Sequence, residues 1–221
     1  MAAAAFLGAS RCAESSESDR SVHSPGAAVS ERVLCFGDSI TRGEALPPGE
    51  GSSLWLLTVE RRSNGRLRLI NEGKNGRSTD SLKGLREALD RHAGEFDSVL
   101  IALGANDAHD FSPHAVSRAK ARLEALIDAA REASPRRRVI VVGPPNVNVE
   151  ALSRTMAHAS EIARRLPEID AAFETEAKES GSPYVRLYGL LPDRTLARDG
   201  IHPDARGNDV IAEAVLRALL E

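Results

Sequence analysis

Residues 32–41 read RVLCFGDSIT, an apolar run that ends in glycine, aspartate and serine. The unbroken apolar stretch Val33 to Phe36 predicts a strand that is buried on both faces, as in a parallel sheet. Gly37 permits a tight turn directly after this strand. The turn would place the hydroxyl of Ser39 at the carboxyl edge of the sheet, where a substrate can reach it. For an isolated Gly-Asp-Ser, however, a capping or turn serine is the simpler interpretation.

Strands and helices alternate along the rest of the chain. Their Val, Ile and Leu content predicts strands at 32–36, 67–71, 98–103, 139–142 and 184–187. Apolar residues three and four apart predict helices at 52–63, 79–92, 113–133, 152–179 and 204–220. Pro167 is expected to divide the fourth of these helices. The pattern predicts one α/β domain over residues 31–221: a three-layer α/β/α sandwich around a five-stranded parallel sheet, with the flavodoxin-like strand order 2-1-3-4-5.

The composition limits the classes of partner. The chain has 221 residues, of which 42% are hydrophobic, enough for the core of one domain. Its 29 Lys and Arg against 32 Asp and Glu give a net charge of −3, and nucleic-acid-binding proteins usually have the opposite excess. No apolar run approaches the ~20 residues of a membrane-spanning helix. We therefore expect a small-molecule substrate, no nucleic acid and no membrane span.

The first 30 residues differ in composition from the rest of the chain. They are rich in Ser, Ala, Glu and Gly without periodicity, so we expect residues 1–30 to be a disordered N-terminal extension. The start MAAAAFLGAS lacks the basic region that precedes a signal peptide's apolar core. We expect a cytoplasmic location, with export by a truncated signal as the alternative. Cys12 in this segment and Cys35 in the first strand form neither a disulfide framework nor a zinc motif.

Three further loops carry residues that suit a serine nucleophile. Gly76, after the second strand, lets the backbone approach a ligand and offer an N–H. Asn106, after the third strand, has a side-chain amide that could donate to an oxyanion beside Ser39. Asp199 precedes His202 by three residues, a spacing at which a carboxylate can hold one ring nitrogen while the other accepts a proton. Each loop taken alone could equally be a polar turn.

Together, the four loops resemble the sequence blocks of the GDSL, or SGNH, hydrolase family. They are Gly-Asp-Ser, the glycine at 76, Gly-x-Asn-Asp and Asp-x-x-His, and they occur in the family's order over about residues 32–216. The resemblance implies a flavodoxin-like fold, ester hydrolysis, no cofactor and no metal. The chain has Ile40 where the family's name has leucine, and Gly73 is a nearby alternative to Gly76.

The resemblance also implies a role for each matching residue. Ser39 is the expected nucleophile, His202 the general base and Asp199 the group that orients it. The backbone N–H groups of Ser39 and Gly76 and the amide of Asn106 are the expected oxyanion hole. The chain would then cleave esters through an acyl-enzyme.

The sequence says less about the identity of the substrate than about the type of reaction. Short inserts between the blocks and the lack of an amphipathic lid favour a short, acetyl-type acyl group. Gly-Arg-Ser at 76–78 is similar to the block of carbohydrate acetylesterases in the family, so an acetylated carbohydrate is the specific alternative. Lysophospholipase and thioesterase activity also stay open. Arg42, Arg77 and His109 are candidates for contacts with the substrate.

Other classes of function remain as alternatives. A flavodoxin-like domain could bind a nucleotide or flavin without chemistry, but the first loop continues as Arg-Gly-Glu and not as a phosphate cradle. A catalytically inactive interaction module would leave the four blocks unexplained. A polar cluster follows the third strand and consists of Asp107, His109, Asp110 and His114. We interpret these residues as loop and cap residues and not as metal ligands.

Overall fold

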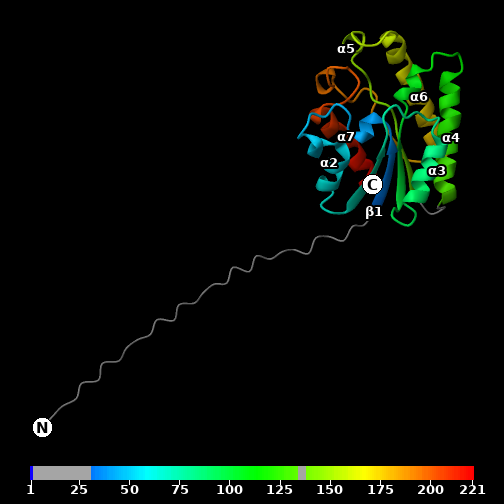
Figure 1. The fold of residues 1–221 in the computed structure, drawn as a ribbon. Helices are drawn as coiled ribbons and strands as arrows, with labels where there is room; N and C mark the ends of the chain where they lie inside the picture. The colour runs from blue at the N-terminus through cyan, green and yellow to red at the C-terminus, as the bar shows by residue number, and fades with distance from the viewer. Residues whose placement is uncertain (2–30, 134–137) are drawn as a thin grey trace.

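The structure is a computed structural model that describes Met1 and residues 31–133 and 138–221. The predicted N-terminal extension over residues 2–30, with Cys12, lies outside the described residues. The described residues form a domain that is organised around a single sheet (Figure 1).

The sheet has five parallel strands in the order β2-β1-β3-β4-β5, which confirms the predicted topology. The strands are β1 (Glu31–Gly37), β2 (Leu67–Gly73), β3 (Ser98–Ala102), β4 (Arg138–Val142) and β5 (Tyr184–Val185). The last strand is shorter than the predicted 184–187 because it lies at the sheet edge and pairs with β4 over only two residues. The central strand β1 pairs with β2 along its whole length and with β3 along most of it.

Helices cover both faces of the sheet (Figure 1). One face packs against α3 (Leu82–Arg91), α4 (Ala115–Ala133) and α6 (Ala159–Glu179). The other packs against α2 (Trp55–Arg62) and α7 (Ala205–Leu220). Shorter turns are α1 (Ser39–Arg42), α5 (Val149–Leu152), η1 (Gly51–Ser53), η2 (Asn106–His109) and η3 (Asp193–Thr195). This arrangement is the three-layer α/β/α sandwich that the sequence predicts.

Strand β1 contributes side chains to the core on both faces of the sheet. Leu34 and Phe36 pack with α3 and α4, whereas Val33 and Cys35 pack with α2 and α7. All four side chains are fully buried. Burial also raises the pKa of the Cys35 thiol. The unbroken apolar run therefore reflects a strand covered on both sides.

The prediction that Pro167 divides a helix is wrong. Helix α6 continues through Pro167, and the break falls earlier, at residues 153–158 between α5 and α6. Proline removes one backbone donor from the helix. Buried side chains on both sides of it, including Leu166 and Ile169, pack into the core and stabilise the helix across this position. Tertiary packing thus outweighs the local preference.

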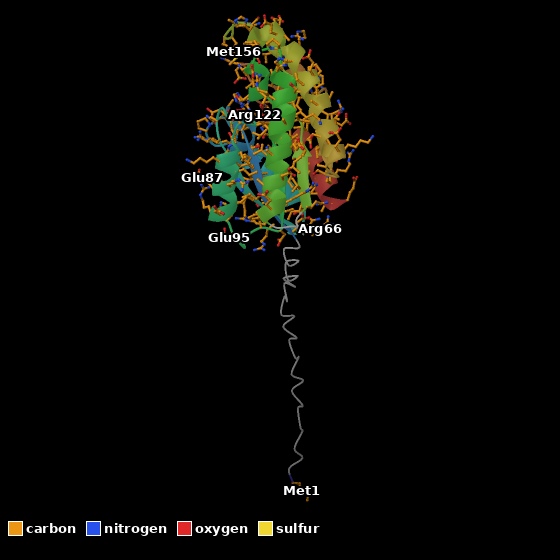
Figure 2. All side chains as sticks on the ribbon, turned by 90° about the vertical axis from the view of Figure 1, so that its right-hand side faces the viewer. Met1, Arg66, Glu87, Glu95, Arg122 and Met156 are labelled. Atoms are coloured by element: carbon orange, nitrogen blue, oxygen red, sulfur yellow. The ribbon has the colours of Figure 1, made fainter. Side chains whose placement is uncertain are left out.

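All strands run in the same direction, so the loops that follow them gather at one end of the molecule. Figure 2 shows this end near Met156, whereas Arg66 and Glu95, which precede strands, lie at the opposite end. The loops after β1, β2 and β3 and the loop before α7 meet at the carboxyl edge of the sheet. None of the described helices is long and apolar enough to cross a lipid bilayer.

Candidate active site

Ser39 is the first residue of α1, directly after β1 and the turn at Gly37. The preceding residue, Asp38, caps this short helix, since its carboxylate accepts a hydrogen bond from the backbone N–H of Ile40 at 2.9 Å. A Cβ atom at Gly37 would lie only 2.0 Å from the hydroxyl oxygen of Thr41, so the turn requires glycine there. The turn holds the serine at the end of the strand, as predicted from the sequence.

A chain of hydrogen bonds connects Ser39, His202 and Asp199. The Nε2 atom of His202 lies 2.9 Å from the hydroxyl oxygen of Ser39. The Nδ1 atom lies 2.6 Å from a carboxylate oxygen of Asp199. Because a carboxylate accepts hydrogen bonds, it favours the tautomer with hydrogen on Nδ1 and leaves Nε2 as the acceptor for the serine proton. The structure therefore brings together three residues that the sequence predicts as one site.

The loop that carries Asp199 and His202 is held by backbone contacts. The N–H of Ala197 donates to the carbonyl of His202 at 2.7 Å, and Leu196 and Pro203 form an antiparallel bridge. At Gly200, which has a φ of 77°, a Cβ atom would lie 2.6 Å from the carbonyl oxygen of Asn148. The loop can therefore pack tightly against the chain before α5 only with glycine at this position.

The carboxylate of Asp199 has several hydrogen-bond donors. Burial alone would raise its pKa, but the His202 ring and the N–H groups of Ile201 and His202 together lower it. The two N–H groups donate to one carboxylate oxygen at 2.9 Å and 3.0 Å. These bonds stabilise the ionised form of Asp199 and fix its orientation toward the ring.

Gly76 and Asn106 lie on the two loops that border Ser39. Gly76 has a φ of 71°, which favours glycine. The side-chain amide of Asn106 donates one hydrogen bond to the carbonyl of Arg77 at 3.0 Å. Since an amide nitrogen carries two hydrogens, a second one remains for a ligand. The structure thus places both predicted oxyanion-hole residues beside the serine.

An open hollow of about 570 Å³ connects these groups. Its lining includes the serine and histidine, both predicted oxyanion residues and several other polar side chains. The lining residues are Ser39, Ile40, Glu44, Asn75, Gly76, Ser78, Ala105, Asn106, His109, Met156, Ile201 and His202. A hollow of this size can accept a small organic ester.

The three candidates for substrate contacts occupy different positions. His109 lines the hollow. Arg42 is exposed and is not among the lining residues. The guanidinium of Arg77 stacks over the ring of Phe36, 3.8 Å from its centroid, and donates to the carbonyl of Gly37 at 2.9 Å. Only His109 of the three therefore lies where a substrate in the hollow could contact it.

The polar cluster after β3 makes contacts within the protein. Asp107 accepts hydrogen bonds from the backbone and side chain of Thr79. Asp110 accepts from the N–H of Ser112 at 3.0 Å and pairs with Arg118. Within residues 31–133 and 138–221, no group of three or more His, Cys, Asp or Glu side chains is placed to hold a metal ion.

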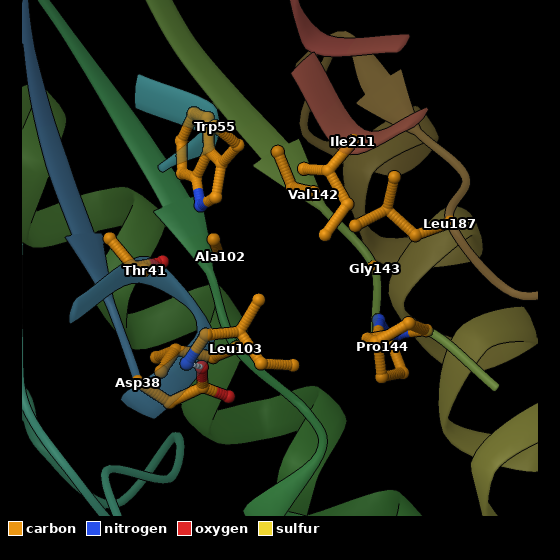
Figure 3. A pocket seen from close by; sticks show the side chains of 12 residues that line it. Asp38, Thr41, Trp55, Ala102, Leu103, Val142, Gly143, Pro144, Leu187 and Ile211 are labelled. Carbon is orange, nitrogen blue, oxygen red and sulfur yellow. Dashed lines mark hydrogen bonds between the residues drawn. The ribbon is translucent and has the colours of Figure 1, made fainter. Parts of the chain in front are cut away.

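Asp38 is a buried carboxylate for which the Gly-Asp-Ser motif alone predicts no separate role. Burial raises its pKa to about 6, although the N–H groups of Ile40 and Thr41 and the nearby His202 partly oppose the shift. Beside it lies a cavity with room for about 20 Å³, close to the volume that one water needs. Figure 3 shows Asp38, Thr41 and Trp55 on one side of this cavity. The signal in the sequence is an acidic residue directly after a buried strand.

The raised pKa of Asp38 predicts a pH-dependent cost to stability. Folding favours the protonated form of Asp38. The stabilisation of the fold by protonated Asp38 is therefore fully present below the unfolded pKa and is lost as the pH rises through about 6. The cost at neutral pH is at most about 3 kcal/mol, from a shift of roughly two units. Asp38→Asn keeps an oxygen for the cap and cannot ionise. In urea titrations, we expect the free energy of unfolding of Asp38→Asn to increase relative to that of the wild type as the pH rises from 4.5 to 8.

Asp199→Asn is the matched control for this measurement. The pKa of Asp199 is lowered, so this carboxylate is ionised in both the folded and the unfolded protein over this pH range, and the stability of Asp199→Asn relative to the wild type should change little between pH 4.5 and pH 8. An Asp38→Asn variant whose stability relative to the wild type is the same at both pH values would contradict the account.

The chain is similar to known proteins in its sequence profile and in its fold. The sequence profile of the GDSL-like lipase/acylhydrolase family matches residues 35–210. No curated protein matches the chain significantly by sequence.

Several solved structures share the fold. A lipase/acylhydrolase from Enterococcus faecalis has 25% identity and a TM-score of 0.66, covering 86% of this chain and 95% of that one. A carbohydrate acetylesterase family member from Sinorhizobium meliloti has 21% identity and a TM-score of 0.71, covering 86% and 97%. The aryl esterase of M. smegmatis has 20% identity and a TM-score of 0.72, covering 86% and 98%.

Proposed function

The chain belongs to the GDSL-like lipase/acylhydrolase family, and from this membership we propose that it is a serine esterase that cleaves short-chain carboxylic esters through an acyl-enzyme. Ser39 is the nucleophile, His202 the general base and Asp199 the residue that orients the base. The observation that carries the proposal is the hydrogen-bonded chain from Ser39 through His202 to Asp199, with distances of 2.9 Å and 2.6 Å.

The first half of the reaction forms the acyl-enzyme. The Oγ atom of Ser39 attacks the ester carbonyl carbon while Nε2 of His202 takes the serine proton. The carbonyl oxygen becomes an oxyanion, which accepts hydrogen bonds from the N–H groups of Ser39 and Gly76 and the free amide hydrogen of Asn106. When the intermediate collapses, the C–O bond to the alcohol breaks and the alcohol takes the proton from His202.

The second half releases the acid. A water molecule gives a proton to Nε2 of His202 and attacks the acyl carbon. The bond to Ser39 then breaks, and the proton returns from the imidazole to the serine oxygen. Asp199 stays ionised throughout and stabilises the charged imidazole that forms in each half.

An acetyl-type acyl group fits the surroundings of Ser39. The hollow is open, and its lining combines apolar residues with polar side chains such as Glu44, Asn75 and His109. Such a lining suits a hydrated alcohol, including a sugar, better than a long lipid chain. The solved structure from Sinorhizobium meliloti, a carbohydrate acetylesterase family member, supports the same choice by its fold alone. A carbohydrate O-acetylesterase is the specific form of this proposal.

The acyl-chain preference can be measured with p-nitrophenyl acetate, butyrate and octanoate. We expect kcat/KM to be highest for acetate and to fall by about tenfold or more at octanoate, because the hollow is open and would leave much of a long chain in contact with water. Acetylated xylose or glucose then tests the carbohydrate proposal by the release of acetate. Ser39→Ala is the control for background hydrolysis.

Each alternative predicts a different result in this series. A preference for octanoate would overturn the short-acyl proposal and favour a lysophospholipase. Faster cleavage of acetyl thioesters than of oxygen esters would favour a thioesterase. No turnover in any assay, together with flavin or nucleotide in the purified protein, would favour a ligand-binding domain.

A further inference from the structure

We propose that Arg77 is a positioning residue that holds the three donors of the oxyanion hole in one arrangement. The sequence suggests Arg77 as a substrate contact, but its part-buried side chain donates to backbone carbonyls next to the loops that carry these donors. The inference rests on the proposed function, since it assigns the donors to an oxyanion.

The guanidinium of Arg77 holds the turn before Ser39. Its Nη1 atom donates to the carbonyl of Gly37 at 2.9 Å and also to the carbonyl of Glu72. Gly37 lies two residues before Ser39, so this bond links the end of β1 to the end of β2. The N–H of Lys74 donates to the same carbonyl of Gly37 at 3.0 Å. The backbone N–H of Ser39 is therefore presented by a turn that Arg77 helps to fix.

The backbone of Arg77 holds the other two donors. Its amide follows Gly76 directly and donates to the carbonyl of Lys74 at 3.2 Å, closing the turn in which Gly76 lies. Its carbonyl accepts from the side-chain amide of Asn106 at 3.0 Å. This bond uses one amide hydrogen and orients the other. Movement of Arg77 would thus displace both Gly76 and Asn106.

The exposed position of Gly76 makes such a tether necessary. Gly76 is exposed, and a Cβ atom placed there would meet nothing within 4 Å. No side chain therefore packs over the α-carbon of Gly76. Two residues that follow Gly76 anchor the loop instead: Arg77, and Thr79, whose backbone and side chain donate to the buried carboxylate of Asp107. Asp107 is the neighbour of Asn106, so Arg77 and Thr79 both connect this loop to the loop that carries Asn106.

An arginine suits this position better than other residues. Its planar guanidinium stacks on the ring of Phe36, 3.8 Å from the centroid, while its edge donates to carbonyls. Burial lowers the pKa of Arg77, and the charges of Glu72 and Asp38 only partly offset this. Even partial burial of a charge costs free energy, and the hydrogen bonds that the part-buried guanidinium of Arg77 forms are those that organise the site.

The test measures turnover and binding separately in Arg77→Met and Arg77→Lys. Arg77→Met keeps the apolar stem but loses every hydrogen-bond donor of the side chain. We expect kcat for p-nitrophenyl acetate to fall by about 10²-fold, since a misplacement of catalytic groups by about 1 Å can have this effect. KM should change by less than about threefold, because the side chain does not contact the substrate. Arg77→Lys keeps a donor without the stacked plane and should recover part of the loss.

A second readout separates positioning from general damage to the fold. The effect of Arg77→Met should be non-additive with that of Asn106→Ala, which on its own removes one oxyanion donor and lowers kcat by about 10²–10³-fold. Arg138→Met is the matched control. Arg138 is also partly buried and bonded to backbone carbonyls, those of Ala218 and Leu219, but at the opposite end of the sheet. The Arg138→Met variant should be less stable than the wild type but have the same kcat.

The outcomes distinguish this inference from the proposed function. If the wild type cleaves esters and a phosphonate labels Ser39, but Arg77→Met has the kcat of the wild type or changes only KM, the positioning role is overturned while the esterase stands. Additive effects with Asn106→Ala would also overturn it. If Arg77→Met does not fold, Arg77→Lys must show the lower kcat with an unchanged KM. A wild type that neither cleaves esters nor reacts with the phosphonate overturns the proposed function itself.

Discussion

Ser39→Ala is expected to lower kcat for p-nitrophenyl acetate by about six orders of magnitude, the size of effect found when a serine protease loses its nucleophile. The substitution removes the hydroxyl oxygen that lies 2.9 Å from the Nε2 atom of His202. Alanine removes a single atom from a residue that begins α1, so the fold should be retained. Turnover is measured spectrophotometrically, with circular dichroism and thermal unfolding of both proteins as the check on folding.

The thermal midpoint provides the control for Ser39→Ala. We expect it to stay within a few degrees of the wild-type value, since the removed hydroxyl bonds to a partly exposed ring and not to the core. A correctly folded variant with more than about one percent of the wild-type kcat would mean that another group is the nucleophile.

Asp199→Asn is expected to lower kcat by about 10⁴-fold, as in the corresponding substitution of a serine protease triad. The carboxylate accepts from the ring and from two backbone N–H groups. An asparagine amide can donate to Nδ1, which favours the wrong tautomer of His202 and leaves Nε2 without its lone pair for the serine proton. KM should change little, because Asp199 is not among the residues that line the hollow.

Asp204→Asn is the matched control, on the same segment of chain. The carboxylate of Asp204 caps α7 by accepting from the N–H groups of Arg206 and Gly207 at 2.8 Å and 2.9 Å. Asparagine also caps helices, so neither kcat nor stability should change greatly. Equal losses of kcat in Asp204→Asn and Asp199→Asn would show that the loss of any carboxylate in this segment, and not the contact with His202, lowers activity.

The central strands β1, β3 and β4 could be predicted from the sequence because they are buried on both faces of the sheet. Each strand then reads as a short apolar run, and the residues directly after it fall at one edge of the sheet. The course of α6 past Pro167 could not be predicted, because it depends on packing contacts of buried side chains such as Ile169 and Phe173. Local signals describe a residue's preference but not the tertiary contacts that outweigh it.

The site shows the same division between local and distant contacts. Asp199 and His202 are three residues apart, so their contact follows from the spacing. Ser39 and His202 are 163 residues apart, and their approach was expected from the resemblance to a family and not from spacing. The sequence gives no local signal for the direction of the Arg77 side chain, since its partner Phe36 lies in β1, far from it along the chain.

Labelling with ethyl p-nitrophenyl methylphosphonate tests the central claim most directly. The reagent bonds its phosphorus to an activated serine oxygen and releases p-nitrophenol, and mass spectrometry of a digest locates the adduct. We predict about one p-nitrophenol per chain, an adduct on the peptide that contains Ser39, and loss of esterase activity in proportion to labelling. Ser39→Ala should release none. An adduct on another residue, or ester hydrolysis that continues when Ser39 is fully modified, would contradict the account.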